Sequence, residues 1–336
     1  MSMGNFYPQK IYYEPQALTY ALGKYLKNKY SGIEWTEIEN HNNISYFRNK
    51  SNCEFAKMKQ NVIIGIRKTH KYVENHKISD YLVPYTSSGC AASCLYCYLV
   101  CNYNKCSYLR LFVNREQMLD KLIKFSKKSD NPLTFEIGSN SDLVLENVLT
   151  RNLSWTIENF AKEGRGFLTF PTKFNMIEKL LPLEHKGKTI VRMSVNPEEI
   201  IRKVEFGTST LQDRIKAIND LCESGYRVGL LIAPVVMVEN WKQLYCELLE
   251  ILKDNLSEKT KKRMTIEVIF MTYSYVHRMI NREAFPKAID LFDGDLMAGG
   301  GRGKYYYKKE IKDSGKDFLQ SEILKKLPDS KVIYMT

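Results

Sequence analysis

The sequence lacks any hydrophobic run long enough to cross a membrane, because no stretch reaches the roughly 18 apolar residues that a spanning helix needs. Its first residues, Met-Ser-Met-Gly-Asn-Phe-Tyr, also lack the basic segment and apolar run of a secretory signal. We therefore expect a cytoplasmic protein with no membrane partner.

Proline and glycine are scarce, at 10 and 18 of the 336 residues, and no internal repeat, low-complexity tract or flexible linker marks a domain boundary. Together with a hydrophobic fraction of 44%, this composition excludes a disordered or fibrous chain. We expect one continuous folded unit with a sizeable core.

Acidic residues are outnumbered: 38 Asp and Glu face 50 Lys and Arg, which gives a formal net charge of +12. A charge of this size favours an anionic partner such as nucleic acid. Lysines that only solvate the surface would give the same net charge, so charge alone leaves both interpretations open.

The chain has eight cysteines, five of them between Cys90 and Cys106. Thiols in a reducing compartment seldom form structural disulfides, so such a cluster indicates metal binding or redox chemistry.

Short runs rich in β-branched and aromatic residues alternate with segments of helical apolar spacing, which predicts βα units and a parallel sheet. The expected strands are Asp80 to Tyr85, Leu133 to Ile137, Phe167 to Phe170, Thr189 to Ser194, Val228 to Pro234 and Thr265 to Phe270. The expected helices are Arg115 to Lys127, Glu146 to Lys162, Leu211 to Ser224 and Trp241 to Leu252. Six units favour an α/β partial barrel, while the strand-like run Asn61 to Arg67 stays unassigned.

The strongest motif is Cys90-Ala-Ala-Ser-Cys94-Leu-Tyr-Cys97, which follows the first expected strand. Three thiolates at C-x3-C-x2-C spacing suit three irons of an iron–sulfur cube and leave the fourth iron open to a substrate. A zinc site is the alternative, but the paired C-x2-C knuckles typical of zinc are absent.

Polar residues follow several of the expected strands. Because the carboxyl ends of parallel strands meet at one edge, Ser141, Lys173 and Ser194 should share the rim with the cysteine loop. A cation and two hydroxyls there could bind a carboxylate and a ribose, although serines at strand ends are also ordinary turn residues.

The cysteine spacing, with Tyr96 before the last cysteine, is the signature of the radical S-adenosylmethionine superfamily. Beyond that loop the chain resembles the spore photoproduct lyases over most of its length. The matching stretches include Ile11 to Leu18, Val62 to Thr69, Cys97 to Leu99, Thr172 to Phe174, Arg192 to Asn196, Phe206 to Ser209 and Gly303 to Tyr305.

The resemblance implies a partial (β/α)6 barrel of the radical S-adenosylmethionine type with N-terminal and C-terminal extensions. It implies that Cys90, Cys94 and Cys97 hold a [4Fe–4S] cluster. It also implies that S-adenosylmethionine is cleaved to a 5′-deoxyadenosyl radical, which reverts the spore photoproduct in DNA (5-thyminyl-5,6-dihydrothymine) to two thymines. Ser141, Lys173, Ser194 and Tyr98 match positions near S-adenosylmethionine, and Tyr96 and Tyr98 match tyrosines that relay hydrogen.

Two departures from the family pattern qualify this resemblance. The family places a hydrogen-donating cysteine where this chain has Ser139, whose strong O–H bond makes it an implausible hydrogen-atom donor. Two alternatives stay open: Cys101 or Cys106 supplies the thiol instead, or both are incidental. The family's Arg-Tyr pair is replaced by glycines before Arg302, although Arg302, Lys304 and Tyr305 still suit contact with DNA.

Three functions stay open: a DNA repair lyase with an altered hydrogen-return step, a radical enzyme with another nucleic-acid or small-molecule substrate, and a noncatalytic DNA-damage binding protein. We favour the lyase. Its expected partners are DNA with a thymine lesion, an electron donor such as flavodoxin or ferredoxin, and a second protein if an external hydrogen donor is needed. Its expected place is the cytoplasm of a spore, either in the spore core or in the germinating spore.

We expect a single unit over 1–336, with an N-terminal extension 1–79, a barrel core 80–275 and a C-terminal segment 276–336 that carries the DNA-contact region.

Overall fold

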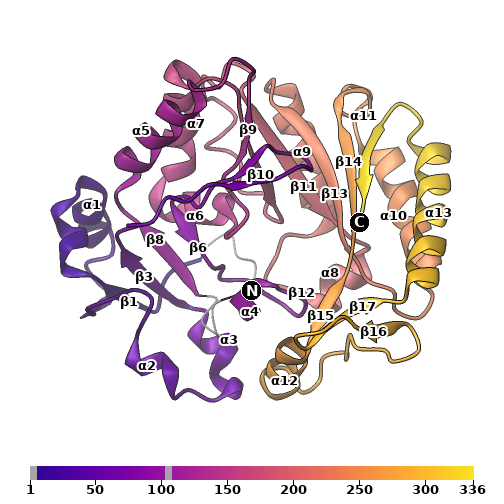
Figure 1. The fold of residues 1–336 in the computed structure, drawn as a ribbon, viewed down its shortest axis with the longest axis horizontal. Helices are drawn as coiled ribbons and strands as arrows, with labels where there is room; N and C mark the ends of the chain where they lie inside the picture. Colours follow the sequence, from indigo (N-terminus) through magenta and orange to yellow (C-terminus); the bar gives the residue numbers. More distant parts are fainter. Residues whose placement is uncertain (1–5, 103–107) are drawn as a thin grey trace.

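The computed structural model describes residues 6–102 and 108–336, apart from the side chains of Arg48, Cys101 and Asn102. Two sheets lie beside each other, with the N-terminal sheet on the left of Figure 1 and a larger curled sheet on the right. In the described residues, no helix is long and apolar enough to cross a membrane.

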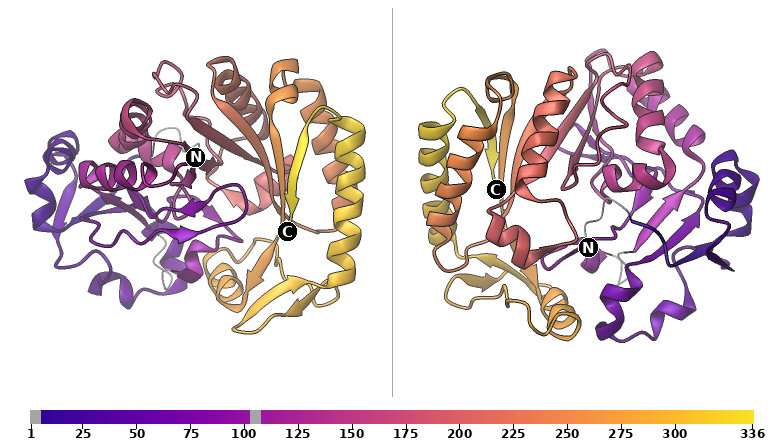
Figure 2. Two further views of the ribbon diagram at one scale, coloured as in Figure 1. Left: turned by 45° about the horizontal axis from the view of Figure 1, so that its top comes forward. Right: turned by 180° about the vertical axis from the view of Figure 1, so that it is seen from behind.

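The larger sheet has the strand order β18-β14-β13-β11-β10-β9-β5-β4. All neighbouring pairs are parallel except β4 with β5, and the sheet curls into a half barrel (Figures 1 and 2). The strands are β4 (Val73–Glu74), β5 (Tyr81–Leu82), β9 (Thr134–Glu136), β10 (Phe167–Thr172), β11 (Thr189–Val195), β13 (Arg227–Val235), β14 (Thr265–Phe270) and β18 (Lys331–Met335). All six expected strands therefore exist, although the first is reduced to two residues, and the C-terminal strand β18 was not predicted.

Helices cover the outer face of the half barrel (Figure 2). They are α5 (Arg115–Ser126), α6 (Leu143–Thr150), α7 (Asn152–Glu163), α9 (Leu211–Glu223), α10 (Trp241–Asn255), α11 (Glu258–Arg263) and α13 (Lys309–Lys326). The single helix expected over 146–162 was wrong. Arg151 adopts φ 57°, a left-handed conformation that ends α6 and starts α7 in a new direction. Gly225 ends α9 at φ 88°, as a glycine after a helix commonly does.

The N-terminal sheet has the order β2-β1-β3-β8-β6. Its strands are β1 (Lys10–Tyr13), β2 (Glu34–Glu37), β3 (Asn61–Gly65), β8 (Leu109–Phe112) and β6 (Ser87–Ser88). The unassigned run near residue 61 is β3, a central strand. Because β6 and β8 follow residue 79, the sheet joins the expected N-terminal extension to the expected core, and the domain division stays a prediction.

Short elements complete this lobe: α1 (Ala21–Lys29), α2 (Ser45–Arg48), α3 (Phe55–Met58) and the 3-10 helices Pro15–Thr19 and Asn52–Glu54. Leu26 of α1 packs on Ile11, Val62, Ile64 and Leu109, and all five side chains are almost fully buried. Each such side chain contributes about 1.5–3 kcal/mol when it leaves water.

Two small antiparallel sheets lie at the carboxyl ends of the barrel strands (Figure 1). One pairs β7 (Ser93–Cys94) with β12 (Glu205–Phe206), which follows α8 (Glu198–Val204). The other has the order β15-β17-β16, formed by β15 (Thr272–Ser274), β17 (Lys304–Tyr307) and β16 (Met297–Gly299). The helices α4 (Leu99–Asn102) and α12 (Tyr275–Ala284) lie near them. The first small sheet ties the cysteine loop to the barrel.

Candidate active site

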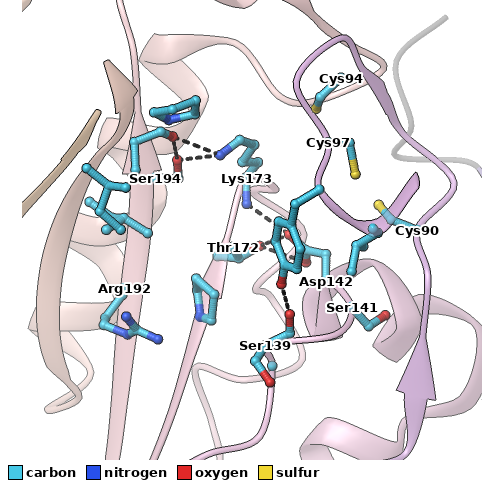
Figure 3. A pocket seen from close by; sticks show the side chains of 18 of the residues that line it. Cys90, Cys94, Cys97, Ser139, Ser141, Asp142, Thr172, Lys173, Arg192 and Ser194 are labelled. Atoms are coloured by element: carbon cyan, nitrogen blue, oxygen red, sulfur yellow. Dashed lines mark hydrogen bonds between the residues drawn. The ribbon is translucent and has the colours of Figure 1, made fainter. Parts of the chain in front are cut away.

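The three motif cysteines lie on one loop and line a cavity of about 470 Å³ inside the half barrel. Figure 3 shows Cys90, Cys94 and Cys97 along one wall, opposite Lys173 and Ser194. Burial raises the pKa of the Cys90 thiol to about 12 and raises that of Cys94 as well. A bound cationic centre would be needed to keep these groups as thiolates at neutral pH.

The three cysteines line one cavity, as the ligands of either metal site considered from the sequence must. Within residues 6–102 and 108–336, no three Cys, His, Asp or Glu side chains converge on one point as ligands of a single ion. A zinc site requires such convergence, whereas each cysteine of an iron–sulfur cube binds a different iron. The three cysteine ligands of a cube need only line one cavity, and Cys90, Cys94 and Cys97 do so.

Side chains from distant elements hold the cysteine loop in place. They donate hydrogen bonds to three of its backbone carbonyls. Two of the donors, Lys59 and His277, are almost fully buried. The bonds join Lys59 Nζ to the Cys90 carbonyl (2.8 Å), Asn281 Nδ2 to the Leu95 carbonyl (2.7 Å) and His277 Nε2 to the Cys97 carbonyl (2.8 Å). The loop is thus held from both the N-terminal lobe and α12.

The three predicted rim residues line the same cavity as the cysteines. Lys173 Nζ donates to Ser194 Oγ at 2.6 Å and to the Ala233 carbonyl at 3.1 Å. Ser141 Oγ donates to the Gly89 carbonyl at 2.8 Å, directly before the first cysteine. The structure therefore brings together the residues that the strand ends predicted, while their contacts with a cofactor stay predictions.

Asp142, which the sequence analysis did not single out, organises this rim. Its half-buried carboxylate accepts the backbone N–H of Val144 at the start of α6, the hydroxyl of Thr172 at 2.9 Å and the backbone N–H of Lys173 at 2.9 Å. Burial raises the pKa of Asp142, and these hydrogen bonds oppose the rise. The signal in the sequence was an aspartate directly before a helical apolar run, which is typical of an N-cap.

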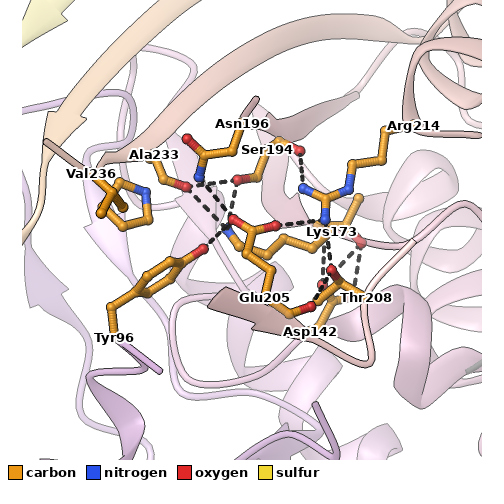
Figure 4. A network of polar contacts seen from close by, with 12 residues as sticks. Tyr96, Asp142, Lys173, Ser194, Asn196, Glu205, Thr208, Arg214, Ala233 and Val236 are labelled. Atoms are coloured by element: carbon orange, nitrogen blue, oxygen red, sulfur yellow. Dashed lines mark hydrogen bonds and ion pairs between the residues drawn. The ribbon is translucent and has the colours of Figure 1, made fainter. Parts of the chain in front are cut away.

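A fully buried carboxylate, that of Glu205, lies at the centre of the polar network in Figure 4. It accepts a hydrogen bond from the Tyr96 hydroxyl, from Asn196 at 2.8 Å and from Arg214 at 2.6 Å. Burial alone would raise the pKa of Glu205, but the Arg214 guanidinium and then the Lys173 ammonium outweigh it and lower the pKa to about 2. The carboxylate is therefore ionised at neutral pH.

The floor of the cavity carries another buried ion pair. Arg192 donates to Glu136 at 2.7 Å and to Glu267 at 3.1 Å, and the Tyr334 hydroxyl donates to Glu267 at 2.6 Å. Arg192 and Ser194 are two residues apart on β11, so both point into the barrel. Arg192 and its two glutamates thus lie one side-chain layer deeper in the barrel than Ser194, one of the predicted S-adenosylmethionine contacts.

The predicted hydrogen-relay residues occupy different places. Tyr96 is buried against Glu205, whereas Tyr98 is 52% exposed, lines the cavity and donates its hydroxyl hydrogen bond to the Ser139 carbonyl. Ser139 lines the cavity too. Cys106 and the side chain of Cys101 fall outside the described residues.

The predicted DNA-contact residues lie on or beside β17. Cross-strand pairing places Tyr306 opposite Thr272, a residue of the cavity rim, and Lys304 opposite Ser274. Arg302, Lys304 and Tyr306 are exposed, but Tyr305 is half-buried and packs on Phe292 with ring centroids 4.5 Å apart. Among the tyrosines of β17 the exposed one is therefore Tyr306, which the sequence analysis did not single out.

Comparison with known proteins extends this picture over the whole chain. The family model "Spore photoproduct lyase" matches residues 6–336. The spore photoproduct lyase of Bacillus subtilis (strain 168) is 33% identical over 339 residues, which cover 98% of this chain and 99% of the relative. The enzyme of Geobacillus sp. (strain Y412MC61) is 30% identical over 342 residues, with 99% and 100% coverage.

Solved structures agree with these sequences. A spore photoproduct lyase variant with bound S-adenosylmethionine and dinucleoside spore photoproduct has a TM-score of 0.91 and 30% identity, over 98% of this chain and 99% of that one. The lyase complexed with dinucleoside spore photoproduct gives the same TM-score at 29% identity and the same coverage. These likenesses confirm the predicted fold class, as well as the [4Fe–4S] cluster and S-adenosylmethionine as the cofactors of this family. The chain belongs to the spore photoproduct lyase family.

Proposed function

We propose that this chain reverts the spore photoproduct in DNA to two thymines through a 5′-deoxyadenosyl radical, and that hydrogen returns to the product by a route without a thiol at position 139. The observation that carries this proposal is the shared cavity: the three cysteines and Ser141 line one side of it, and Lys173 and Ser194 lie opposite. When bound, the cluster supplies the electron that cleaves S-adenosylmethionine.

The cofactor end of the cavity would be formed by residues of four strand ends and the cysteine loop. Cys90, Cys94 and Cys97 would hold the cluster, and the Lys173 ammonium would receive the carboxylate of S-adenosylmethionine. The hydrogen bonds of Lys173 go to two neutral acceptors, Ser194 Oγ and the Ala233 carbonyl, and its ammonium is 3.9 Å from the Glu205 carboxylate. A carboxylate can therefore replace one of the neutral acceptors.

The hydrogen-return step would involve Tyr98. Its hydroxyl is hydrogen bonded to the backbone of Ser139, at the position where the family resemblance places the donor thiol. Among the cavity residues that the structure describes, the three ligand cysteines are the only thiols. A tyrosine can pass a hydrogen atom from its O–H group to a carbon radical, provided that a second donor restores its own hydrogen.

The lesion strand would lie across the exposed face of the β15-β17-β16 sheet. Tyr306 offers a ring for base stacking beside the cavity rim, and Lys304 and Arg302 offer cations for phosphates. The net charge of +12 would favour this approach.

We also propose that flavodoxin or ferredoxin in the spore cytoplasm supplies the electron. A second protein supplies the hydrogen atom if no internal donor suffices.

The experiment that tests the function is anaerobic incubation of the reconstituted protein with S-adenosylmethionine, reductant and an oligonucleotide containing the spore photoproduct. Both 5′-deoxyadenosine and repaired thymine pairs are quantified. We expect both to form. Deoxyadenosine with an unchanged lesion would overturn the proposed substrate and leave the radical chemistry in place for another one.

The hydrogen route is tested by four variants in the same assay. Tyr98→Phe should reduce repair and increase abortive products, because it removes the hydroxyl and keeps the ring. Ser139→Cys should restore a thiol route and lower abortive products. Cys101→Ala and Cys106→Ala should leave the products unchanged, and a loss of repair in either one would assign the hydrogen return to that thiol.

DNA contact is tested by binding of lesion DNA at several salt concentrations. Lys304→Ala should weaken binding and reduce the slope of log affinity against log salt by about one, since one phosphate contact is lost. Tyr306→Ala should weaken binding by about 1–3 kcal/mol with little change in that slope. Lys325→Ala, at an exposed lysine near the end of α13, is the matched control and should change neither quantity.

A further inference from the structure

The backbone of Glu205 is part of the support of the cysteine loop. Glu205 pairs with Cys94, and Phe206 with Ser93, in the antiparallel β12–β7 sheet. The Leu95 N–H also donates to the Val204 carbonyl at 2.9 Å. The segment 204–206 therefore lies directly against the second ligand cysteine.

The side chain of Glu205 connects that loop to the barrel strands. One oxygen receives the Tyr96 hydroxyl, which belongs to the residue between Cys94 and Cys97. The other receives Arg214, which is fully buried and also donates to the Ser194 carbonyl at 3.0 Å. Since Ser194 is the last residue but one of β11, the carboxylate joins the cysteine loop to the strand end that faces it.

The same carboxylate reaches Lys173. The Lys173 ammonium is 3.9 Å from Glu205 Oε1 and 5.7 Å from the centre of the Tyr96 ring. Figure 4 shows Tyr96, Lys173 and Arg214 directed at Glu205 from three sides. A single anion thus contacts the cysteine loop and the cation of the opposite wall.

We propose that Glu205 is a positioning residue that holds the cysteine loop and the Lys173 ammonium at a fixed distance from each other. The two groups that would anchor S-adenosylmethionine, the cluster on the cysteine loop and Lys173, are then in place before it binds. This inference rests on the proposed function only in assuming that the cluster and S-adenosylmethionine bind in this cavity. Preorganisation of this kind strengthens binding because the anchors lose little freedom when the ligand arrives.

A purely structural role would account for part of the network but not for its placement. A buried ion pair is weak evidence for stability, because the desolvation of two charges offsets most of their attraction. Glu205 and Arg214 could be replaced by apolar side chains if they only filled the core. Their hydrogen bonds instead end on Tyr96 and on Ser194, which lie on the two walls of the cavity.

The test uses Glu205→Gln, which keeps the size of the side chain and removes its charge. We measure the dissociation constant of S-adenosylmethionine on the cluster-loaded protein and the reduction potential of the cluster by a redox titration followed by electron paramagnetic resonance. We expect about tenfold weaker binding, because Lys173 and Tyr96 lose their common anchor. We also expect a more positive potential, because removal of a nearby negative charge favours reduction, by about 59 mV for a tenfold shift of this one-electron couple.

Because Glu205→Gln leaves the buried Arg214 without its anionic partner, a second variant keeps the test valid if the single variant fails to fold. Glu205→Gln with Arg214→Met removes both buried charges, and replacement of a whole buried pair is often tolerated. It should show the same loss of S-adenosylmethionine affinity. Glu14→Gln is the matched control, since Glu14 is buried in the N-terminal sheet, and it should change neither affinity nor potential.

Two outcomes would overturn the inference: S-adenosylmethionine binding that is unchanged or tighter in both Glu205 variants, or an equal loss in Glu14→Gln. Failure of the proposed function would look different. The wild-type protein would then bind and cleave S-adenosylmethionine without repairing the lesion, and the affinity and potential of the Glu205 variants would still report on positioning.

Discussion

Glu205 and Glu14 are both buried glutamates, one in the half barrel and one in the N-terminal sheet, and their partners differ in kind. Glu14 accepts the backbone N–H groups of His41 at 3.0 Å and Ile66 at 2.9 Å and lies 2.8 Å from His41 Nδ1. Its partners do not line the cavity. Glu205 instead receives a guanidinium, a phenol and an amide, and is near an ammonium of the cavity wall.

The difference separates a carboxylate that closes a local backbone gap from one that connects two walls of an active site. Glu14 joins β1 to neighbouring loops, and its hydrogen bonds satisfy N–H groups that would otherwise be buried without partners. Glu205 contacts side chains from four separate parts of the chain. Burial alone therefore does not mark a functional group, but the elements that a buried charge connects can do so.

The largest effect should come from Cys94→Ala, which removes the ligand beside Glu205. We expect loss of the cluster and undetectable cleavage of S-adenosylmethionine, measured by iron and sulfide content and by 5′-deoxyadenosine release. Cys53→Ala, at an exposed cysteine outside the cavity, is the control and should retain both. Normal iron content in Cys94→Ala would remove the cysteine loop from the site.

A smaller loss is expected for Lys173→Met, which removes the cation that Glu205 faces. Hydrogen bonds to charged groups contribute about 1.5–3 kcal/mol, so the dissociation constant of S-adenosylmethionine should rise about 10- to 100-fold. Isothermal titration on the cluster-loaded protein measures it. Lys188→Met removes a lysine that bonds to the carbonyls of Ala161 and Gly164 outside the cavity, and it should bind normally. Equal losses in the two variants would contradict the assignment of Lys173.

Glu14→Gln should affect stability and leave the chemistry unchanged. In the variant, the amide NH2 group would face the backbone N–H groups that donate to the carboxylate in the wild type. We expect this loss of hydrogen bonds to lower the free energy of unfolding by about 1–3 kcal/mol. Urea unfolding of the variant and the wild type measures this cost. A variant with normal stability but impaired cleavage would break the contrast with Glu205.

The smallest effect is a pH dependence. Burial would raise the pKa of Glu14, but the hydrogen bonds from His41 and Ile66 outweigh it, and the folded pKa lies below the ordinary value. The unfolded chain therefore binds this proton more readily, so the stabilisation is present above about pH 4.3 and lost as the pH falls towards the folded pKa. Between those pH values, the free energy of unfolding of Glu14→Gln should fall less steeply with decreasing pH than that of the wild type. The two slopes should differ by at most about 1.4 kcal/mol per pH unit. Identical slopes would show that Glu14 does not titrate differently on folding.

Much of the site follows from local sequence. The cysteine spacing and the strand ends placed Cys90, Ser141, Lys173 and Ser194 at one rim, because parallel strands bring their carboxyl ends to one edge whatever connects them. The alternation of strands and helices also predicted the barrel class, since each unit has its own hydrophobic period.

What the sequence left out depends on contacts between distant segments. Glu205 lies 109 positions from Tyr96, and nothing near it indicates that partner. Arg214 did carry a signal, since it shares the apolar stripe of α9 with Leu211, Ile215 and Ile218, where an arginine implies a buried partner. The break at Arg151 was missed because both helices continue one apolar pattern, and β18 because only its pairing with β14 shows it to be a strand.

The most direct test of the central claim uses an oligonucleotide whose spore photoproduct carries deuterium at the carbon from which the adenosyl radical takes hydrogen. The products are analysed by mass spectrometry after anaerobic turnover of the wild-type protein. The proposed function predicts deuterium in 5′-deoxyadenosine together with repaired thymine pairs. Unlabelled deoxyadenosine beside an intact lesion would contradict it.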